Sequence, residues 1–84
     1  MWKILVMPRA RKDLRKLDKR ISGRIIEKIK QASLNPKKYF HELVDSPYSK
    51  LRIGDYRVIA VVEIKDKEIE IRKIGHRKNI YKKI

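Results

Sequence analysis

Two short segments of this chain concentrate side chains that could bind and cut a phosphodiester. The first runs from Lys50 to Arg57 and places Lys50, Arg52 and Arg57 on both sides of a Gly-Asp pair. The second runs from Gly75 to Tyr81 and adds an imidazole, more cations and a phenol. A guanidinium offers a planar fork of N–H donors that matches phosphate oxygens and does not lose its charge. The two segments therefore predict a site for a phosphate-bearing partner.

If the partner is an RNA that is cut without a metal, as the family resemblance given below implies, each of these groups has a different task. The 2′-hydroxyl must lose its proton to a base, charge on the phosphorane must be stabilised, and the leaving oxygen must gain a proton. We predict that Arg57 holds the scissile phosphate and that Lys50 and Arg52 support it. Arg52 lies two residues after Lys50, so both side chains are on the same face of their strand. Tyr81 is the candidate base, since nearby cations favour the phenolate; stacking on a nucleobase or capping the core are the alternatives. His76 is expected to have a structural role or to contact a protein partner rather than to act in catalysis.

The composition indicates a polyanionic partner. The 84 residues carry 24 Lys and Arg against 10 Asp and Glu, a formal charge of +14. Such a surplus favours nucleic acid or an acidic protein as partner, with simple solubility as the alternative. Cations also crowd the first expected helix, and on the functional interpretation these side chains hold nucleic-acid phosphates rather than line a solvated face. They are Arg9, Arg11, Lys12, Arg15, Lys16, Lys19 and Arg20. Of these, we single out Arg11, Lys12, Arg15 and Lys19 as candidate nucleic-acid-binding residues.

The length and residue content bound the class of protein. Residues 1–84 are expected to form one domain, and the 42% of hydrophobic residues suffice for a modest core. The lack of cysteine excludes disulfides and cysteine-ligated metals, and we expect no cofactor. The apolar run from Met1 to Met7 is too short for a signal peptide or a membrane span. We therefore expect a cytoplasmic protein without a membrane partner.

Periodic apolar residues predict the elements that position the basic segments. Trp2–Val6 is expected to be a strand, and His41–Val44 a short strand or a turn. A helical stripe predicts helices at about 8–20 and 22–34, separated at Ser22-Gly23 and ended by Asn35-Pro36. The stripe consists of Leu14, Leu17, Ile21, Ile25 and Ile29.

Three strands are expected at 50–53, 56–64 and 68–74, with a hairpin turn at Gly54-Asp55 and a second turn at 65–67. One apolar face is expected to hold Val58, Ala60, Val62 and Ile64, matched by Ile69 and Ile71. The resulting order, β-α-α-β-β-β, is an α+β fold in which a helical hairpin packs on a mainly antiparallel sheet. The opposite face of that sheet stays free for chemistry.

The layout and two motifs resemble the RelE branch of the RelE/ParE toxin superfamily across nearly the whole chain. The motifs are Lys50-Leu-Arg-Ile-Gly-Asp-Tyr-Arg57 and Ile74-Gly-His-Arg-Lys-Asn-Ile-Tyr81. The resemblance implies the toxin of a type II toxin–antitoxin module, which enters the ribosomal A site and cuts mRNA without a metal. It also implies contacts with rRNA and a hetero-oligomer with a RelB-like antitoxin that wraps and silences the toxin.

The resemblance also assigns roles to single residues. Arg77 is similar to the second catalytic arginine of the family, and Lys50 to one of its catalytic-site lysines. Tyr48 stands where a second lysine is expected, so that Arg52 or Lys78 would have to compensate. The alternatives are a ParE-like toxin that poisons DNA gyrase without being a nuclease, and a degenerate toxin that only binds. Arg57, Arg77 and Tyr81 together favour the nuclease.

Overall fold

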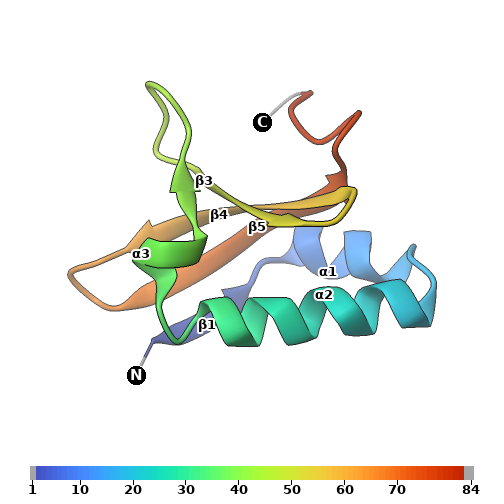
Figure 1. Ribbon diagram of the computed structural model, residues 1–84, viewed down its shortest axis with the longest axis horizontal. Coiled ribbons are helices and arrows are strands. Elements are labelled where there is room, and N and C mark those ends of the chain that lie inside the picture. Colours follow the sequence, from blue (N-terminus) through green and yellow to red (C-terminus); the bar gives the residue numbers. More distant parts are fainter. Residues whose placement is uncertain (1, 83–84) are drawn as a thin grey trace.

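The computed structural model describes residues 2–82, which form a five-stranded sheet with its two longer helices on one face (Figure 1). The strand order is β1-β5-β4-β3-β2; β1 runs parallel to β5 and the other neighbours are antiparallel. The elements are β1 (Lys3–Val6), α1 (Pro8–Arg15), α2 (Lys19–Ala32), α3 (Pro36–Tyr39), β2 (His41–Glu42), β3 (Ser49–Ile53), β4 (Tyr56–Glu63) and β5 (Glu68–His76).

The predicted α+β class and the mainly antiparallel sheet are confirmed. The segment predicted as a short strand or a turn, His41–Val44, begins as the strand β2. The structure adds α3 to the predicted order, so Asn35-Pro36 begins a short helix where the sequence predicted only the end of the preceding one. β4 ends at Glu63, and Ile64 lies exposed in the turn, so its predicted place on the apolar face is wrong. Within residues 2–82, no helix has the length and apolar character needed to cross a membrane.

The break between the first two helices lies at Leu17-Asp18, and the prediction that placed it at Ser22-Gly23 is wrong. The Asp18 carboxylate accepts a hydrogen bond from the backbone N–H of Arg20 at 2.8 Å and so caps α2. Gly23 lies exposed inside α2, where a glycine costs only about 1 kcal/mol relative to alanine. A cap that satisfies a free N–H group outweighs a weak helix former at an exposed position.

The core lies between the helices and one sheet face. Val58 and Ala60 of β4 and Ile69 and Ile71 of β5 are fully buried there, as the alternation predicted. The helices contribute a buried set, Ala10, Ile25, Ile29 and Ala32, and a partly buried set, Leu14, Leu17 and Ile21. The alternation that buries Val58 and Ala60 turns their neighbours Arg57 and Ile59 to the opposite face of the sheet. We call this opposite side the open face.

A β-bulge in β5 changes which side chains reach the open face. Ile59 pairs with Lys73 but Ala60 pairs with Ile71, so Arg72 is an additional residue in β5. After it, Ile74 points into the core and Lys73 to the open face. The Asp13 side chain of α1 accepts the Ile74 N–H at 2.9 Å, because β1 has already ended at this edge.

Two segments rise from the sheet on the side away from α1 and α2 (Figure 1). One is the connection between β2 and β3, residues 43–48, and the other is the C-terminal tail, residues 77–82. Both border the open face. The fold therefore frames this face at two ends, while the helices close the opposite side of the sheet.

Candidate functional site

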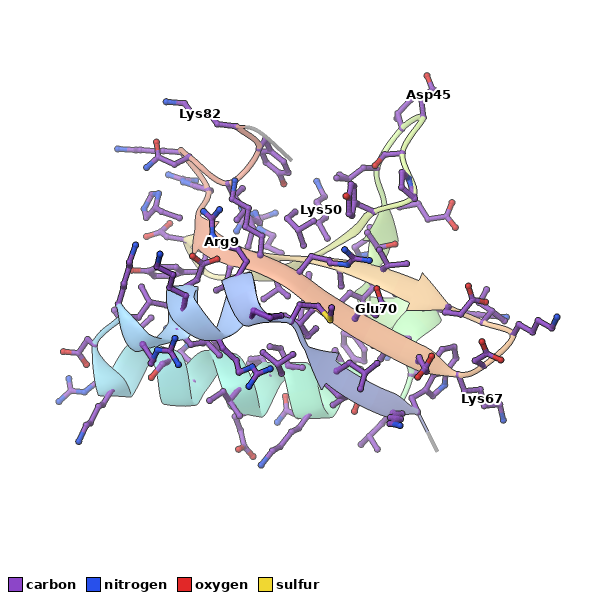
Figure 2. The ribbon with its side chains drawn as sticks, turned by 180° about the vertical axis from the view of Figure 1, so that it is seen from behind. Arg9, Asp45, Lys50, Lys67, Glu70 and Lys82 are labelled. Atoms are coloured by element: carbon purple, nitrogen blue, oxygen red, sulfur yellow. The ribbon has the colours of Figure 1, made fainter. Side chains whose placement is uncertain are left out.

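The open face brings together three of the predicted site residues. Arg52 of β3 lies directly across from Arg57 of β4, and Lys50 lies across from Ile59, which in turn pairs with Lys73 of β5. Side chains of such cross-strand neighbours have Cβ atoms about 5 Å apart. Figure 2 shows Lys50 between the tail, at Lys82, and the loop that carries Asp45. Four cations therefore share one small surface.

Arg57 is buried in this surface rather than extended into solvent. Only 8% of the residue is exposed. Its Nη1 group donates to the carbonyl oxygens of Gly54 at 2.7 Å and of Tyr56 at 2.8 Å. Nε and Nη2 donate no hydrogen bond within residues 2–82. One edge of the guanidinium is thus fixed by backbone oxygens, while the other edge keeps its donors for a ligand.

The β3–β4 hairpin turn creates this arrangement. Gly54 has a φ of +57°, a left-handed conformation that glycine adopts without strain. The turn directs the Gly54 carbonyl back toward the strand that follows, where its oxygen accepts a hydrogen bond from Arg57 Nη1. The Gly-Asp pair predicted as a hairpin signal therefore also orients the central arginine.

Arg77 lies at the rim of the open face, just past the end of β5. Its backbone N–H donates to the Asp55 carbonyl oxygen at 2.8 Å, which ties it to the β3–β4 turn. Its Nε lies 3.7 Å from Asp55 Oδ1, and 54% of its side chain is exposed. A surface pair of this length stabilises little and is easily exchanged for another anion. The guanidinium is close to the turn that holds Arg57, and it remains accessible.

The C-terminal tail packs onto the open face through Ile80. Ile80 is 1% exposed and lies over Gly75, where a Cβ atom would meet its Cδ1 at 3.2 Å. Gly75 is the cross-strand partner of Arg57, so the tail covers the strand pair that carries the central arginine. Lys73 Nζ donates to the Lys82 carbonyl oxygen at 2.6 Å. Tyr81 lies between these two contacts, with 44% of its surface exposed.

The remaining residues of the second motif have local roles. The His76 ring packs edge-to-face on Tyr56, with centroids 5.7 Å apart, and its Nδ1 accepts the Lys78 N–H at 3.2 Å. These contacts agree with the structural role predicted for His76. Lys78 is exposed in the turn that follows β5, next to Arg77.

The cations predicted on the first helix do not join the open face. Arg11, Lys12 and Arg15 lie on α1 and Lys19 begins α2, in the helical layer on the other side of the sheet (Figure 1). Arg11 Nε donates to the Val6 carbonyl oxygen at 3.2 Å, and all four residues are exposed. The structure therefore holds two basic surfaces, separated by the sheet and core.

The sequence analysis missed three residues of this region. Lys73 was missed because the bulge at Arg72, which turns it to the open face, leaves no mark in the apolar alternation. Gly75 and Ile80 were missed because their contact depends on how the tail folds back. The isolated apolar Ile80 within a polar segment was the one available signal.

Comparisons with known proteins place this geometry in a family. The family described as "ParE toxin of type II toxin-antitoxin system, parDE" matches residues 4–81. A chain of the toxin-antitoxin complex RelBE2 from Mycobacterium tuberculosis has a TM-score of 0.84 at 24% identity, over 90% of this chain and 98% of that chain. A comparison with curated proteins finds no match.

Two archaeal complexes are also similar. A chain of the RelE-RelB complex from Pyrococcus horikoshii OT3 has a TM-score of 0.73 at 28% identity, over 93% of this chain and 97% of that chain. A chain of the RelB-RelE antitoxin-toxin complex from Methanococcus jannaschii has a TM-score of 0.72 at 26% identity, over 95% and 98%. Together with the family match, they confirm the predicted membership of the RelE/ParE superfamily. The chain belongs to the ParE toxin family of type II toxin–antitoxin systems, within the RelE/ParE superfamily.

Proposed function

We propose that this toxin is a ribosome-dependent mRNA endoribonuclease and that its active site is the open face. The observation that carries the proposal is the buried guanidinium of Arg57, which has carbonyl partners on one edge and cationic neighbours around it. A buried charge is costly unless an opposite charge offsets it. The scissile phosphate of an RNA would supply that charge at the centre of the cluster.

The proposed reaction needs no group beyond these side chains and water. Tyr81 takes the proton of the 2′-hydroxyl, whose oxygen attacks the adjacent phosphorus while the bond to the 5′ oxygen breaks. Arg57 and Arg77 stabilise the phosphorane, and Lys50 and Arg52 add positive charge. The leaving oxygen takes its proton from a water hydrogen-bonded to Arg77, and the hydroxide left behind takes up the proton that Tyr81 received, which returns Tyr81 to the phenolate that begins the reaction. The products are a 2′,3′-cyclic phosphate and a 5′-hydroxyl.

Arg11, Lys12, Arg15 and Lys19 of the helical layer are proposed to hold ribosomal RNA phosphates. They lie on the opposite side of the sheet from the proposed active site, where they can contact RNA without competing for the messenger. Binding of this kind weakens steeply with salt. Lys78 is proposed to contact the messenger beside Arg77.

A RelB-like antitoxin is the proposed protein partner. The archaeal structures to which this chain is similar are RelB–RelE complexes, and such a partner would form a hetero-oligomer with this toxin. Covering the open face or displacing the tail would block the proposed active site. A complex in which both stay exposed would contradict this mode of silencing.

Poisoning of DNA gyrase is the second candidate function, favoured by the ParE description of the matching family. The two functions share a fold, so topology does not separate them. The residue types support the nuclease: Arg57 lies on the open face, Arg77 at its rim and Tyr81 in the tail that packs there, and poisoning gyrase by binding needs no base beside a phosphate site.

Primer extension on cellular mRNA after induction of the toxin tests the proposal, with gyrase-dependent DNA breaks scored in the same cells. We expect codon-phased cuts and no breaks; breaks without cuts would establish the second candidate. The Arg57→Ala, Arg77→Ala double variant should relieve the arrest of translation. Lys65→Ala, in the β4–β5 turn at the other end of the sheet, loses a cation and should stay fully toxic. A fully toxic double variant would show that the site is wrongly assigned.

A further inference from the structure

We infer that Lys73 and Gly75 are positioning residues for Tyr81, the base of the proposed reaction. The inference rests on the proposed function for its catalytic part and on two contacts of the tail for its structural part. Tyr81 lies outside every helix and strand, in turns that follow β5. A base must lie within hydrogen-bond reach of the hydroxyl, and a displacement of about 1 Å can cost 10²-fold in rate. A residue so placed needs other parts of the fold to fix it.

One contact fixes the residue before Tyr81. Ile80 lies almost fully buried over Gly75, and its backbone N–H donates to the His76 carbonyl oxygen at 3.0 Å. The 3.2 Å gap between Ile80 Cδ1 and a Cβ built on Gly75 is tighter than ordinary van der Waals contact. Glycine at position 75 is therefore what allows the tail to approach β5 this closely.

The other contact fixes the residue after Tyr81. The Lys73 ammonium donates to the Lys82 carbonyl oxygen at 2.6 Å, and the Lys82 N–H donates to the Asn79 carbonyl oxygen at 3.2 Å. Hydrogen bonds from charged donors are shorter and stronger than neutral ones. Lys73 is half-buried on the open face, so its stem is held by packing while its head holds the tail.

Both anchors belong to the strand that pairs with the one carrying Arg57. Gly75 lies across from Arg57, and Lys73 lies across from Ile59 two residues further along β4. The backbone on both sides of Tyr81 is thereby fixed relative to the strand pair that carries Arg57. Lys73 acts on the base through the backbone of Lys82 and contacts no reacting atom.

Three variants separate positioning from a general loss of charge. Lys73→Met keeps the stem and removes the donor, Lys73→Arg keeps a donor, and Lys65→Met is the matched loss of a lysine at the far end of the β4–β5 hairpin. We expect faster amide hydrogen exchange at Ile80 and Lys82, whose N–H groups are hydrogen-bonded in the tail, in Lys73→Met alone. Equal protection of the tail in Lys73→Met and the parent protein would overturn the inference.

The catalytic part is measured by single-turnover mRNA cleavage on ribosomes. Lys73→Met should lower the rate constant about 10-fold or more, with the concentration for half-saturation changed no more than in Lys65→Met, and Lys73→Arg should restore the rate. In a Tyr81→Phe background, Lys73→Met should have no further effect. An equal loss in both backgrounds would show that Lys73 contacts the substrate and would overturn positioning. If the parent protein fails to cleave at all, the proposed function fails, and hydrogen exchange still decides whether Lys73 holds the tail.

Discussion

Replacing Arg57 tests whether its guanidinium stabilises the fold as well as the proposed transition state. Arg57→Met removes the donors to the carbonyl oxygens of Gly54 and Tyr56 and keeps most of the apolar stem. Hydrogen bonds from charged donors contribute about 1.5–3 kcal/mol each. Two effects reduce that sum. The Gly54 carbonyl lies in an exposed turn and can be hydrated, and the variant also removes a buried charge that faces Arg52.

The net expectation is a loss of about 2 kcal/mol in the free energy of unfolding, since one of the two bonds remains uncompensated. For a chain of this size such a loss lowers the melting temperature by about 10 °C. Urea denaturation at neutral pH, followed by circular dichroism, measures the change. An m-value equal to that of the parent would show that Arg57→Met and the parent expose the same surface on unfolding.

Arg52→Met is the matched control, because Arg52 lies opposite Arg57, is exposed and makes no side-chain hydrogen bond within residues 2–82. Its stability should change by less than about 0.5 kcal/mol. An Arg57→Met protein as stable as the parent would refute the reasoning, because it would show that the cost of burying the charge cancels the hydrogen bonds.

Arg57→Lys should cleave at least about 10²-fold more slowly than the parent, since a lysine cannot bond the turn and present a planar fork together.

Two further substitutions test how the site is held. Asp13→Ala should cost about 2–3 kcal/mol in urea denaturation, because it frees the Ile74 N–H at the sheet edge; Asp66→Ala, in an exposed turn, should cost less than about 0.5 kcal/mol. Gly54→Ala should destabilise by about 1 kcal/mol, because alanine resists a φ of +57°, whereas Gly23→Ala in α2 should be neutral or stabilising. Equal effects within either pair would contradict the assigned contacts.

The parts of the fold that sequence predicted are those governed by local periodicity. Alternation in β4 placed Val58 and Ala60 in the core and Arg57 on the opposite face, and the Gly54-Asp55 pair marked the hairpin. Lys50 and Arg52 were predicted on one face because residues two apart in a strand point the same way. These are consequences of geometry within a few residues, so a single sequence carries them.

The parts that sequence could not predict depend on contacts between distant segments. The bulge at Arg72 reverses the alternation of β5, and nothing in the apolar pattern marks it before the register with β4 is known. The carboxylate of Asp13 reaches a strand 61 residues away. The helix break is an exception, because Asp18, a favoured capping residue, marks it locally, whereas Ser22-Gly23 is a competing local signal that the structure does not follow.

The two basic surfaces explain how one small toxin could bind the ribosome and yet be silenced by one partner. The helical layer and the open face lie on opposite sides of the sheet (Figure 1). RNA that surrounds the protein can contact both at once. Much of the +14 charge would then serve to attract RNA, and only a few cations would take part in the reaction. On the proposed function, an antitoxin would need to cover only the open face, because Arg57, the proposed phosphate ligand, lies there. Loss of cations from the helical layer should therefore weaken ribosome binding and make its affinity depend less steeply on salt concentration. Loss of Arg57 or Arg77 should instead abolish cleavage in a protein that still binds the ribosome.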